Sequence, residues 1–249
     1  MIQIAIFSDV HGNLPALEVV LNDIRERGIT QKFCLGDLVD FAPWGNEVIE
    51  KIKENNIPCI LGNHDERIAF DLPVTALSKH SEKETAARFA AIDHSKKHIT
   101  DKNKSFLAEL PFHLKLNYKI GKKHWGIQLV HSGLESNDTY LYEFEEDEIF
   151  NEILNASQSD VIVMGHTHIS FKKEIGEKWA INTGSVGRSK EENRLASYLV
   201  MTLDEENILP EIIQLNYPLD EVATQIEWSD IPNYYAGFLR NEKVSSVEI

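Results

Sequence analysis

Short apolar runs and polar loops alternate in a regular way at the start of the chain. Apolar runs at residues 2–7, 32–35 and 57–61 are each followed by a polar loop, and apolar residues at helical spacing occupy 14–27 and 46–55. These patterns predict buried strands and amphipathic helices. Successive strand–loop–helix units predict parallel strands joined by crossover helices. We therefore expect the loops after the three strands to meet at one edge of a sheet.

The pattern changes in the middle of the chain. Residues 66–110 are rich in Ala, Lys, Glu and Ser and predict a helical insertion, with its clearest helix at 81–99. Further strands are predicted at 112–120, 124–131, 161–164, 171–175, 178–182, 195–203 and 208–215, and further helices at 146–156 and 219–228. A βαβαβ half followed by a strand-rich half predicts an α/β fold. We expect one domain, residues 1–249, built as a four-layer αββα sandwich of two mixed β-sheets with flanking helices.

The charge of the chain limits its partners. The 249 residues carry a formal net charge of −15, from 25 Lys and Arg against 40 Asp and Glu. This balance argues against binding to long nucleic acid, which relies on Lys and Arg to neutralise phosphates. Small phosphate compounds remain compatible with it, because bound metal ions reverse the local field at a site.

Other features of the sequence point to a cytoplasmic protein. The first residues lack the basic region and the small-residue cleavage site of a signal peptide. No apolar stretch approaches the ~20 residues that span a membrane, so no membrane partner is expected. Cys34 and Cys59 each lie in an apolar run, which favours two reduced core thiols over a disulfide or a metal site.

The polar loops after the predicted strands carry side chains that bind metal ions. In an extended segment, residues two apart point the same way, so Asp9 and His11 can reach one point. Taken singly, each motif is explained as well by a capped turn, a surface loop or a structural histidine, and for Asp65 helix capping is the preferred interpretation. Taken together, five such loops contain two Asp, one Asn and five His, which packing alone does not require: Asp9 and His11; Asp37; Asn63 and His64; His131; His166 and His168.

The ordered series of these motifs resembles the calcineurin-like metallophosphoesterase superfamily over residues 2–203. Within that superfamily, the chain is most similar to small bacterial phosphodiesterases and to phosphatases related to diadenosine tetraphosphate hydrolases. The resemblance implies a set of metal ligands: Asp9, His11 and His168 for one ion, Asn63, His131 and His166 for the other, and Asp37 bridging both. It also implies that His64 contacts the substrate phosphate or leaving group and that Asp40 orients His64. Phe41 stands where the protein phosphatase branch has an Arg, which argues against protein phosphatase activity.

The motifs and the family resemblance together predict an enzyme. Two divalent metal ions lower the pKa of a shared water and bind phosphate oxygens. We expect dinuclear-metal-dependent hydrolysis of phosphoester bonds in small phosphorylated substrates, by a phosphodiesterase or a phosphatase, with nucleotides as the leading substrate class. The donors suit Mn, Fe or Zn best, and Ni and Co also fit them.

Two alternative functions stay open. A nuclease of the same superfamily is disfavoured by the acidic composition. A catalytically silent scaffold with this fold is disfavoured because every ligand position and His64 are present. The sequence is compatible with a homodimer.

Two residue pairs lie outside the motif set. His94 and His98 are four apart on a predicted helix, a spacing that can bind metal, but no third ligand is evident, so we interpret them as surface or structural residues. Phe41 and Trp44 follow Asp37. They could stack on a nucleobase, but packing within the protein is the preferred interpretation.

Overall fold

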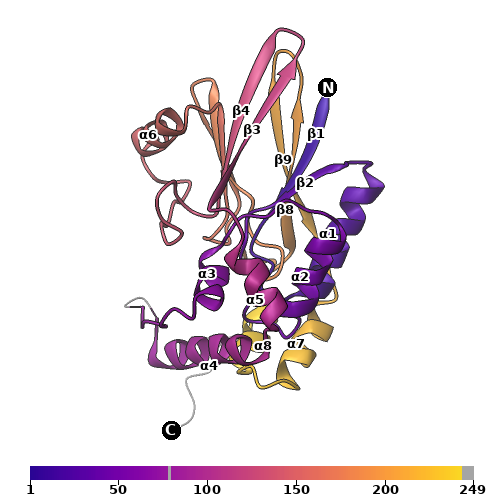
Figure 1. Cartoon of the computed structure of the whole chain (residues 1–249), viewed down its shortest axis with the longest axis vertical. Helices are drawn as coiled ribbons and strands as arrows, with labels where there is room; N and C mark the ends of the chain where they lie inside the picture. The colour runs from indigo at the N-terminus through magenta and orange to yellow at the C-terminus, as the bar shows by residue number, and fades with distance from the viewer. Residues whose placement is uncertain (78–79, 243–249) are drawn as a thin grey trace.

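Two mixed β-sheets packed face to face form the centre of the computed structural model, which describes residues 1–77 and 80–242 (Figure 1). The first sheet has the order β2 (Gln31–Cys34), β1 (Ile2–Phe7), β8 (Ala196–Leu203), β9 (Ile208–Leu215). In it β1 pairs parallel with β2 and antiparallel with β8. The second has the order β3 (His113–Ile120), β4 (Lys123–Val130), β5 (Val161–Met164), β7 (Lys178–Asn182), β6 (Phe171–Ile175). Its three central strands are parallel, and its two edge strands are antiparallel to their neighbours.

Apolar side chains from the facing sides of the two sheets fill the space between them. Ile4 and Met201 from the first sheet belong to the same buried cluster as Ile127 and Val163 from the second. Because side chains alternate across a strand, the opposite faces need their own cover. Helices provide it on both sides, which gives the four αββα layers that the sequence predicts.

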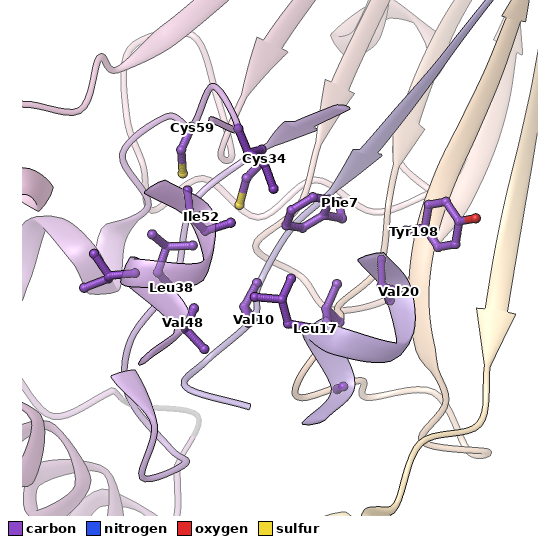
Figure 2. Close-up of a cluster of buried hydrophobic side chains, with 14 of the residues drawn as sticks. Phe7, Val10, Leu17, Val20, Cys34, Leu38, Val48, Ile52, Cys59 and Tyr198 are labelled. Carbon is purple, nitrogen blue, oxygen red and sulfur yellow. The ribbon is translucent and has the colours of Figure 1, made fainter. Parts of the chain in front are cut away.

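The first sheet is covered by α1 (Leu14–Glu26) and α2 (Gly45–Glu54). Leu17 of α1 and Ile52 of α2 pack in one buried cluster with Phe7 of β1 (Figure 2). The second sheet is covered by α6 (Asp147–Ser157), whose Phe150 and Leu154 are buried with residues of β5 and β6. In Figure 1, α6 lies on the opposite side of the sheets from α1 and α2.

The remaining helices gather at one end of the sandwich (Figure 1). They are α3 (Asn63–Ala69), α4 (Glu82–His98), α5 (Asp101–Ala108), α7 (Leu219–Glu227) and α8 (Tyr234–Leu239). Ser81 and Thr100 begin α4 and α5 by accepting hydrogen bonds from backbone N–H groups in the first turns. Small residues of α4, Ala87 and Ala91, pack in one cluster with residues of α7 and α8.

The predicted strand at 57–61 is wrong. This segment makes only an isolated parallel bridge, between Cys34 and Cys59. Pro58 has no N–H to donate to a ladder, and the chain enters α3 at Asn63. The short helix α8 was not predicted, and α3 and α5 fall largely within the predicted helical region 66–110 without having been predicted individually. The other elements lie within a few residues of their predicted positions.

Two further findings concern the cysteines and the membrane. Cys34 and Cys59 are buried free thiols, as predicted. Among the described residues, no helix combines the length and apolar character needed to cross a membrane.

Candidate metal centre

Loops at the carboxyl ends of strands from both sheets converge at one place. Backbone hydrogen bonds tie these loops together: the N–H of Asp9 donates to the Gly36 carbonyl over 3.0 Å, and the N–H of His11 donates to the Asp37 carbonyl over 2.9 Å. From the other sheet, the N–H of Gly165 donates to the His131 carbonyl over 2.9 Å. The position of each loop is therefore set by a loop from a distant part of the chain.

Several residues of these loops adopt the left-handed backbone region, which side chains with a Cβ rarely occupy. Non-glycine residues with positive φ at the site are Asp9, His11, Asp37, Asp40, Phe41, His166 and His168. Each such conformation costs on the order of 1 kcal/mol or more and persists only where the surroundings enforce it. Because these conformations are concentrated in the loops of the site, the placement of the side chains here is maintained despite strain in the backbone.

Close backbone approaches leave no room for side chains at two glycines. A Cβ on Gly62 would lie 2.2 Å from Oδ1 of Asp37, and a Cβ on Gly165 would lie 2.4 Å from Oδ2 of Asp9. Glycine at these positions lets the backbone of one loop pack directly against a carboxylate of another.

All seven predicted metal ligands come together, in two groups. In the first group, Nε2 of His168 lies 3.1 Å from Oδ1 of Asp9 and 3.1 Å from Nε2 of His11. In the second, Oδ1 of Asn63 lies 3.1 Å from Nε2 of His131 and 3.2 Å from Nδ1 of His166.

The carboxylate of Asp37 lies between these two groups. Its Oδ2 is 3.7 Å from Nε2 of His11 and 3.5 Å from Nε2 of His131. Its Oδ1 accepts the backbone N–H of His64 over 2.8 Å, which holds the carboxylate in this orientation. Among the side chains that the structure describes, Asp37 thus approaches a histidine of each group.

Backbone carbonyls orient three of the imidazoles. Nδ1 of His11 lies 3.0 Å from the Val39 carbonyl, Nδ1 of His131 lies 2.9 Å from the Leu35 carbonyl, and Nδ1 of His168 lies 2.8 Å from the Arg188 carbonyl. A carbonyl can only accept, so Nδ1 carries the proton in each ring. Nε2 of each ring then faces the shared centre, as in metal-binding histidines.

Two unsatisfied oxygens show that a metal ion fits here. Oδ1 of Asp9 and Oδ2 of Asp37 are buried and have no hydrogen-bond partner among the described residues. Buried carboxylate oxygens without partners are costly. The donor set of carboxylate, amide oxygen and imidazole suits a borderline divalent cation such as Mn, Fe or Zn. The buried Asp and His side chains therefore form a site suited to a divalent metal.

The pKa values of these groups are strongly shifted. Burial would raise the pKa of Asp9, but His168 and His131 hold it well below its usual range. Burial lowers the pKa of His168 to about 4, although Asp9 opposes this effect. Burial would also lower the pKa of His131, but Asp37 and Asp9 raise it to about 10. Near neutral pH, Asp9 and His168 are thus already in their metal-binding forms, whereas His131 must lose a proton to bind a metal ion.

His64 and Asp40 form a pair beside the metal donors. Nδ1 of His64 lies 2.5 Å from Oδ2 of Asp40. The ring of His64 packs edge-on against Phe41, with ring centroids 4.9 Å apart. Asp65 has a structural role, as the sequence indicates, because its carboxylate accepts the backbone N–H groups of Leu38 and Gly62.

A cavity of about 300 Å³ opens from the metal donors. Its wall contains basic and aromatic residues that carry no sequence motif: Arg67, Arg88, Arg188, Lys190, Tyr140 and Tyr235. Arg67 lies one helical turn after Asn63, but this spacing became informative only once α3 was known to begin at Asn63. Phe41 is buried against Tyr235 with ring centroids 4.7 Å apart, which favours the packing interpretation for this residue. Trp44 packs against the cluster formed with α7 and α8 and is not part of this cavity wall.

Outside this centre, the fold brings Asp230 to the histidine pair of α4. Ligand atoms of His94, His98 and Asp230 lie within 4.8 Å of one another. The sequence alone did not indicate this third residue. A larger hollow of about 550 Å³ lies beside α1 and contains none of the motif residues.

The fold and the buried donors together define a metallophosphoesterase. Residues 2–206 match the calcineurin-like phosphoesterase superfamily domain, and the chain belongs to this family. It is 32% identical over 248 residues to the uncharacterized protein MJ0912 of Methanocaldococcus jannaschii, with 93% of this chain and 94% of that protein covered. The chain is therefore a metal-dependent phosphoesterase, and its general reaction is phosphoester hydrolysis.

Solved structures agree with this fold. The metallophosphoesterase from Sphaerobacter thermophilus superposes with a TM-score of 0.76 at 22% identity, covering 97% of this chain and 99% of that one. The hypothetical protein PH1004 from Pyrococcus horikoshii superposes with a TM-score of 0.79 at 21% identity, covering 96% of this chain and 98% of that one.

Proposed function

We propose that this protein hydrolyses phosphoester bonds in small phosphorylated substrates with two divalent metal ions. The position of Asp37 Oδ2 between the two donor groups carries this proposal. In this assignment Asp9, His11 and His168 hold one ion, Asn63, His131 and His166 hold the other, and Asp37 contacts both. Mn, Fe and Zn are the leading metals, with Co and Ni also compatible with these donors.

The bound ions would supply a low-pKa water and neutralise phosphate charge. The proposed role of His64 is separate from metal binding. Asp40 accepts the Nδ1 proton of His64, so Nε2 is the ring nitrogen left for a ligand in the cavity that His64 lines. From there it can hydrogen-bond the phosphate or donate a proton to the departing oxygen, a step worth ~10²–10⁴-fold in rate. Asp40 is a positioning residue because it acts through His64.

A small substrate fits the dimensions and the charge of the site. The metal donors are buried at the inner end of a cavity of about 300 Å³, while the chain as a whole carries a net charge of −15. A long nucleic acid would have to approach this acidic surface, whereas a small phosphate ester can enter the cavity. Tyr140 in the wall is a half-buried aromatic side chain that a nucleobase can contact, which supports nucleotides as the leading substrate class.

The helical insertion takes part in this site. Thr75, Glu84 and Arg88, all within residues 66–110, line the cavity beside the metal donors. We propose that the chain works as one domain in which this insertion forms a wall of the pocket and selects the substrate. The homodimer and the cytoplasmic location stay predictions from the sequence.

A nuclease and a silent scaffold are the competing functions. A nuclease should bind single-stranded DNA at low salt, which the net charge disfavours. A scaffold has no need of a complete donor set or of His64 held by Asp40. The presence of both supports catalysis.

Hydrolysis of two chromogenic esters tests the proposal. The metal-stripped protein is assayed with bis-p-nitrophenyl phosphate and p-nitrophenyl phosphate, with and without Mn²⁺, while bound metal is measured. Turnover restored by metal, with about two ions per chain, is the expected result, and the ratio of the two rates separates diesterase from monoesterase activity. His64→Ala should keep both ions and lose ~10²–10⁴-fold in turnover. A chain that binds no metal would overturn the proposal in favour of the scaffold.

A further inference from the structure

Two arginines are buried side by side in the wall of the cavity. Arg67 from α3 is 8% exposed and Arg88 from α4 is 7% exposed. Burial, and then the nearby positive charge of Arg67, lower the pKa of Arg88, whereas Tyr235, Tyr140 and Asp40 oppose this shift. Nη1 of Arg67 is buried without a hydrogen-bond partner among the described residues, whereas Nη1 of Arg88 donates to the Thr75 carbonyl over 2.8 Å.

The carboxylates around the cavity make no direct ion pair with these two arginines in the described part of the chain, although Asp40 acts on Arg88 from a greater distance. Oδ2 of Asp40 is taken by His64, and Oδ1 of Asp138 accepts a hydrogen bond from Nδ2 of Asn63 over 3.1 Å. Oε1 of Glu84 lies 3.5 Å from Nε2 of His80. No ion pair within 4.0 Å joins Arg67 or Arg88 to an acid in the described part of the chain. Two buried, adjacent and unpaired positive charges are costly unless an anion joins them.

Arg188, a third arginine of the wall, is placed differently. Its guanidinium lies 4.4 Å from the ring centroid of Phe41 and 4.7 Å from that of Phe238. The faces of aromatic rings attract a cation, so Arg188 is stabilised without a bound anion. Among the described residues, no aromatic ring makes a comparable contact with Arg67 or Arg88, and these two arginines are the pair that an anion would stabilise.

Arg67 and the predicted metal ligand Asn63 lie on the same helix, α3. Arg67 follows Asn63 by four residues, and residues at this spacing are neighbours on a helix surface, with Cβ atoms ~5–6 Å apart. Asn63 belongs to the second donor group. Asn63, Arg67 and Arg88 line the same cavity, so an anion held by the arginines shares that cavity with a phosphate held at the metal donors.

We propose that Arg67 and Arg88 bind a second phosphate group of the substrate, linked through an anhydride oxygen to the phosphate at the metal centre. The substrates would then be phosphate esters with a polyphosphate chain, such as nucleoside polyphosphates. Guanidinium groups bind phosphate through charge-assisted hydrogen bonds, and Nη1 of Arg67 is a buried donor without a partner among the described residues. This inference rests on the proposed function, because it extends the same cavity.

Binding of inorganic tripolyphosphate to the full chain without added metal tests the pair directly. Calorimetry should show binding by the wild type and at least ~10-fold weaker binding by Arg67→Gln and by Arg88→Gln, since each variant loses a charge-assisted hydrogen-bond donor. Arg67→Lys keeps the positive charge, so its affinity for tripolyphosphate should lie between that of the wild type and that of Arg67→Gln. Arg25→Gln, an exposed arginine on α1, is the matched control and should bind as the wild type does. Equal binding by all variants would overturn the proposal.

Thermal unfolding separates a binding role from a structural one. Replacing Arg88 removes a buried repulsion, so Arg88→Gln should unfold at or above the wild-type temperature in phosphate-free buffer. Tripolyphosphate should raise the unfolding temperature of the wild type and raise that of Arg88→Gln much less. An Arg88→Gln variant that melts well below the wild type without ligand would indicate that the arginine supports the fold.

Kinetics with the Mn²⁺-loaded enzyme identify the arrangement of phosphates. The ratio of kcat/KM for a nucleoside triphosphate to kcat/KM for bis-p-nitrophenyl phosphate should fall at least ~10-fold in Arg67→Gln. In a sugar bisphosphate the two phosphates are separated by carbon atoms. The kcat/KM for such a substrate, taken relative to that for bis-p-nitrophenyl phosphate, should fall less in Arg67→Gln. Equal losses for all three substrates would overturn the second-phosphate site. If the wild type turns over none of them yet binds tripolyphosphate through these arginines, the proposed function fails and the binding site stands.

Discussion

The carboxylate of Asp40 lies 2.5 Å from Nδ1 of His64, and both side chains are almost completely buried. Asp40 reaches this position with φ of 73°, a strained conformation for a residue with a Cβ. A charged acceptor at Nδ1 fixes the ring of His64 and leaves Nε2 for the cavity. The strain at Asp40 is explained if the orientation of His64 matters for function.

Replacement of this carboxylate tests the pair. Asp40→Asn should lower kcat ~10–100-fold with unchanged metal content, because the amide no longer stabilises a positively charged His64. The double variant Asp40→Asn/His64→Ala should be no slower than His64→Ala alone, since the two side chains act as one unit. Asp93→Asn, an exposed acid of α4, is the control. Additive losses in the double variant would show that Asp40 acts independently of His64.

Asp37 should be the residue on which metal content depends most. Its Oδ2 faces both donor groups, so Asp37→Ala should lose metal ions from both positions together with activity. Asp37→Asn keeps one oxygen and the shape of the side chain, and we expect it to retain more metal than the alanine variant. Metal analysis after gel filtration makes the comparison. Normal metal content in Asp37→Ala would rule out the bridging role.

Gly62 lacks a side chain at the place where the Asp37 carboxylate packs. A Cβ at this position would lie 2.2 Å from Oδ1 and 2.3 Å from the backbone nitrogen of Asp37. Gly62→Ala should therefore displace the Asp37 loop, lower metal affinity and cost ~1–3 kcal/mol of unfolding free energy. Gly126→Ala is the matched control, because its nearest atoms would lie 3.6 Å away. Denaturant unfolding and metal titration of both variants give the result, and wild-type metal affinity in Gly62→Ala would contradict it.

The metal-free protein should lose stability in mild acid through His94. Burial, and then the neighbouring His98, lower the pKa of His94 below 6.5, whereas Asp230, Asp40 and Asp93 oppose the shift. Between this lowered pKa and about 6.5, the unfolded chain holds a proton that the folded chain does not. The free energy of unfolding therefore falls as the pH drops through this interval, and above it the contribution is constant.

Replacing His94 alone separates its contribution to the pH dependence of unfolding from that of the other titratable groups. His94→Gln should show a shallower decrease in unfolding free energy between about pH 7 and pH 5 than the wild type. His113→Gln, at an exposed position of β3, serves as the control. Equal pH dependence in the wild type and His94→Gln would show that other groups account for the whole effect.

Local patterns in the sequence were enough to predict most elements. The alternation of β3 between exposed and half-buried positions and the apolar run of β5 are properties of short segments, and both strands were predicted close to their observed bounds. The segment 57–61 was misjudged because an apolar run of this length occurs both in strands and in buried extended loops. Only hydrogen bonding to a neighbour distinguishes them, and here Pro58 limits it.

The sequence by itself determined the sandwich fold and the kinds of side chain at the strand ends, because hydrophobic periodicity and the spacing of Asp, Asn and His are local properties. Only the tertiary structure decided which side chains meet. It placed Asp37 between two donor groups and brought Arg88 of α4 to Arg67 of α3, residues 21 positions apart with no shared motif. Such contacts arise from the packing of whole helices and sheets. Their energies depend on burial and on charges contributed by distant segments, which no short stretch of sequence contains.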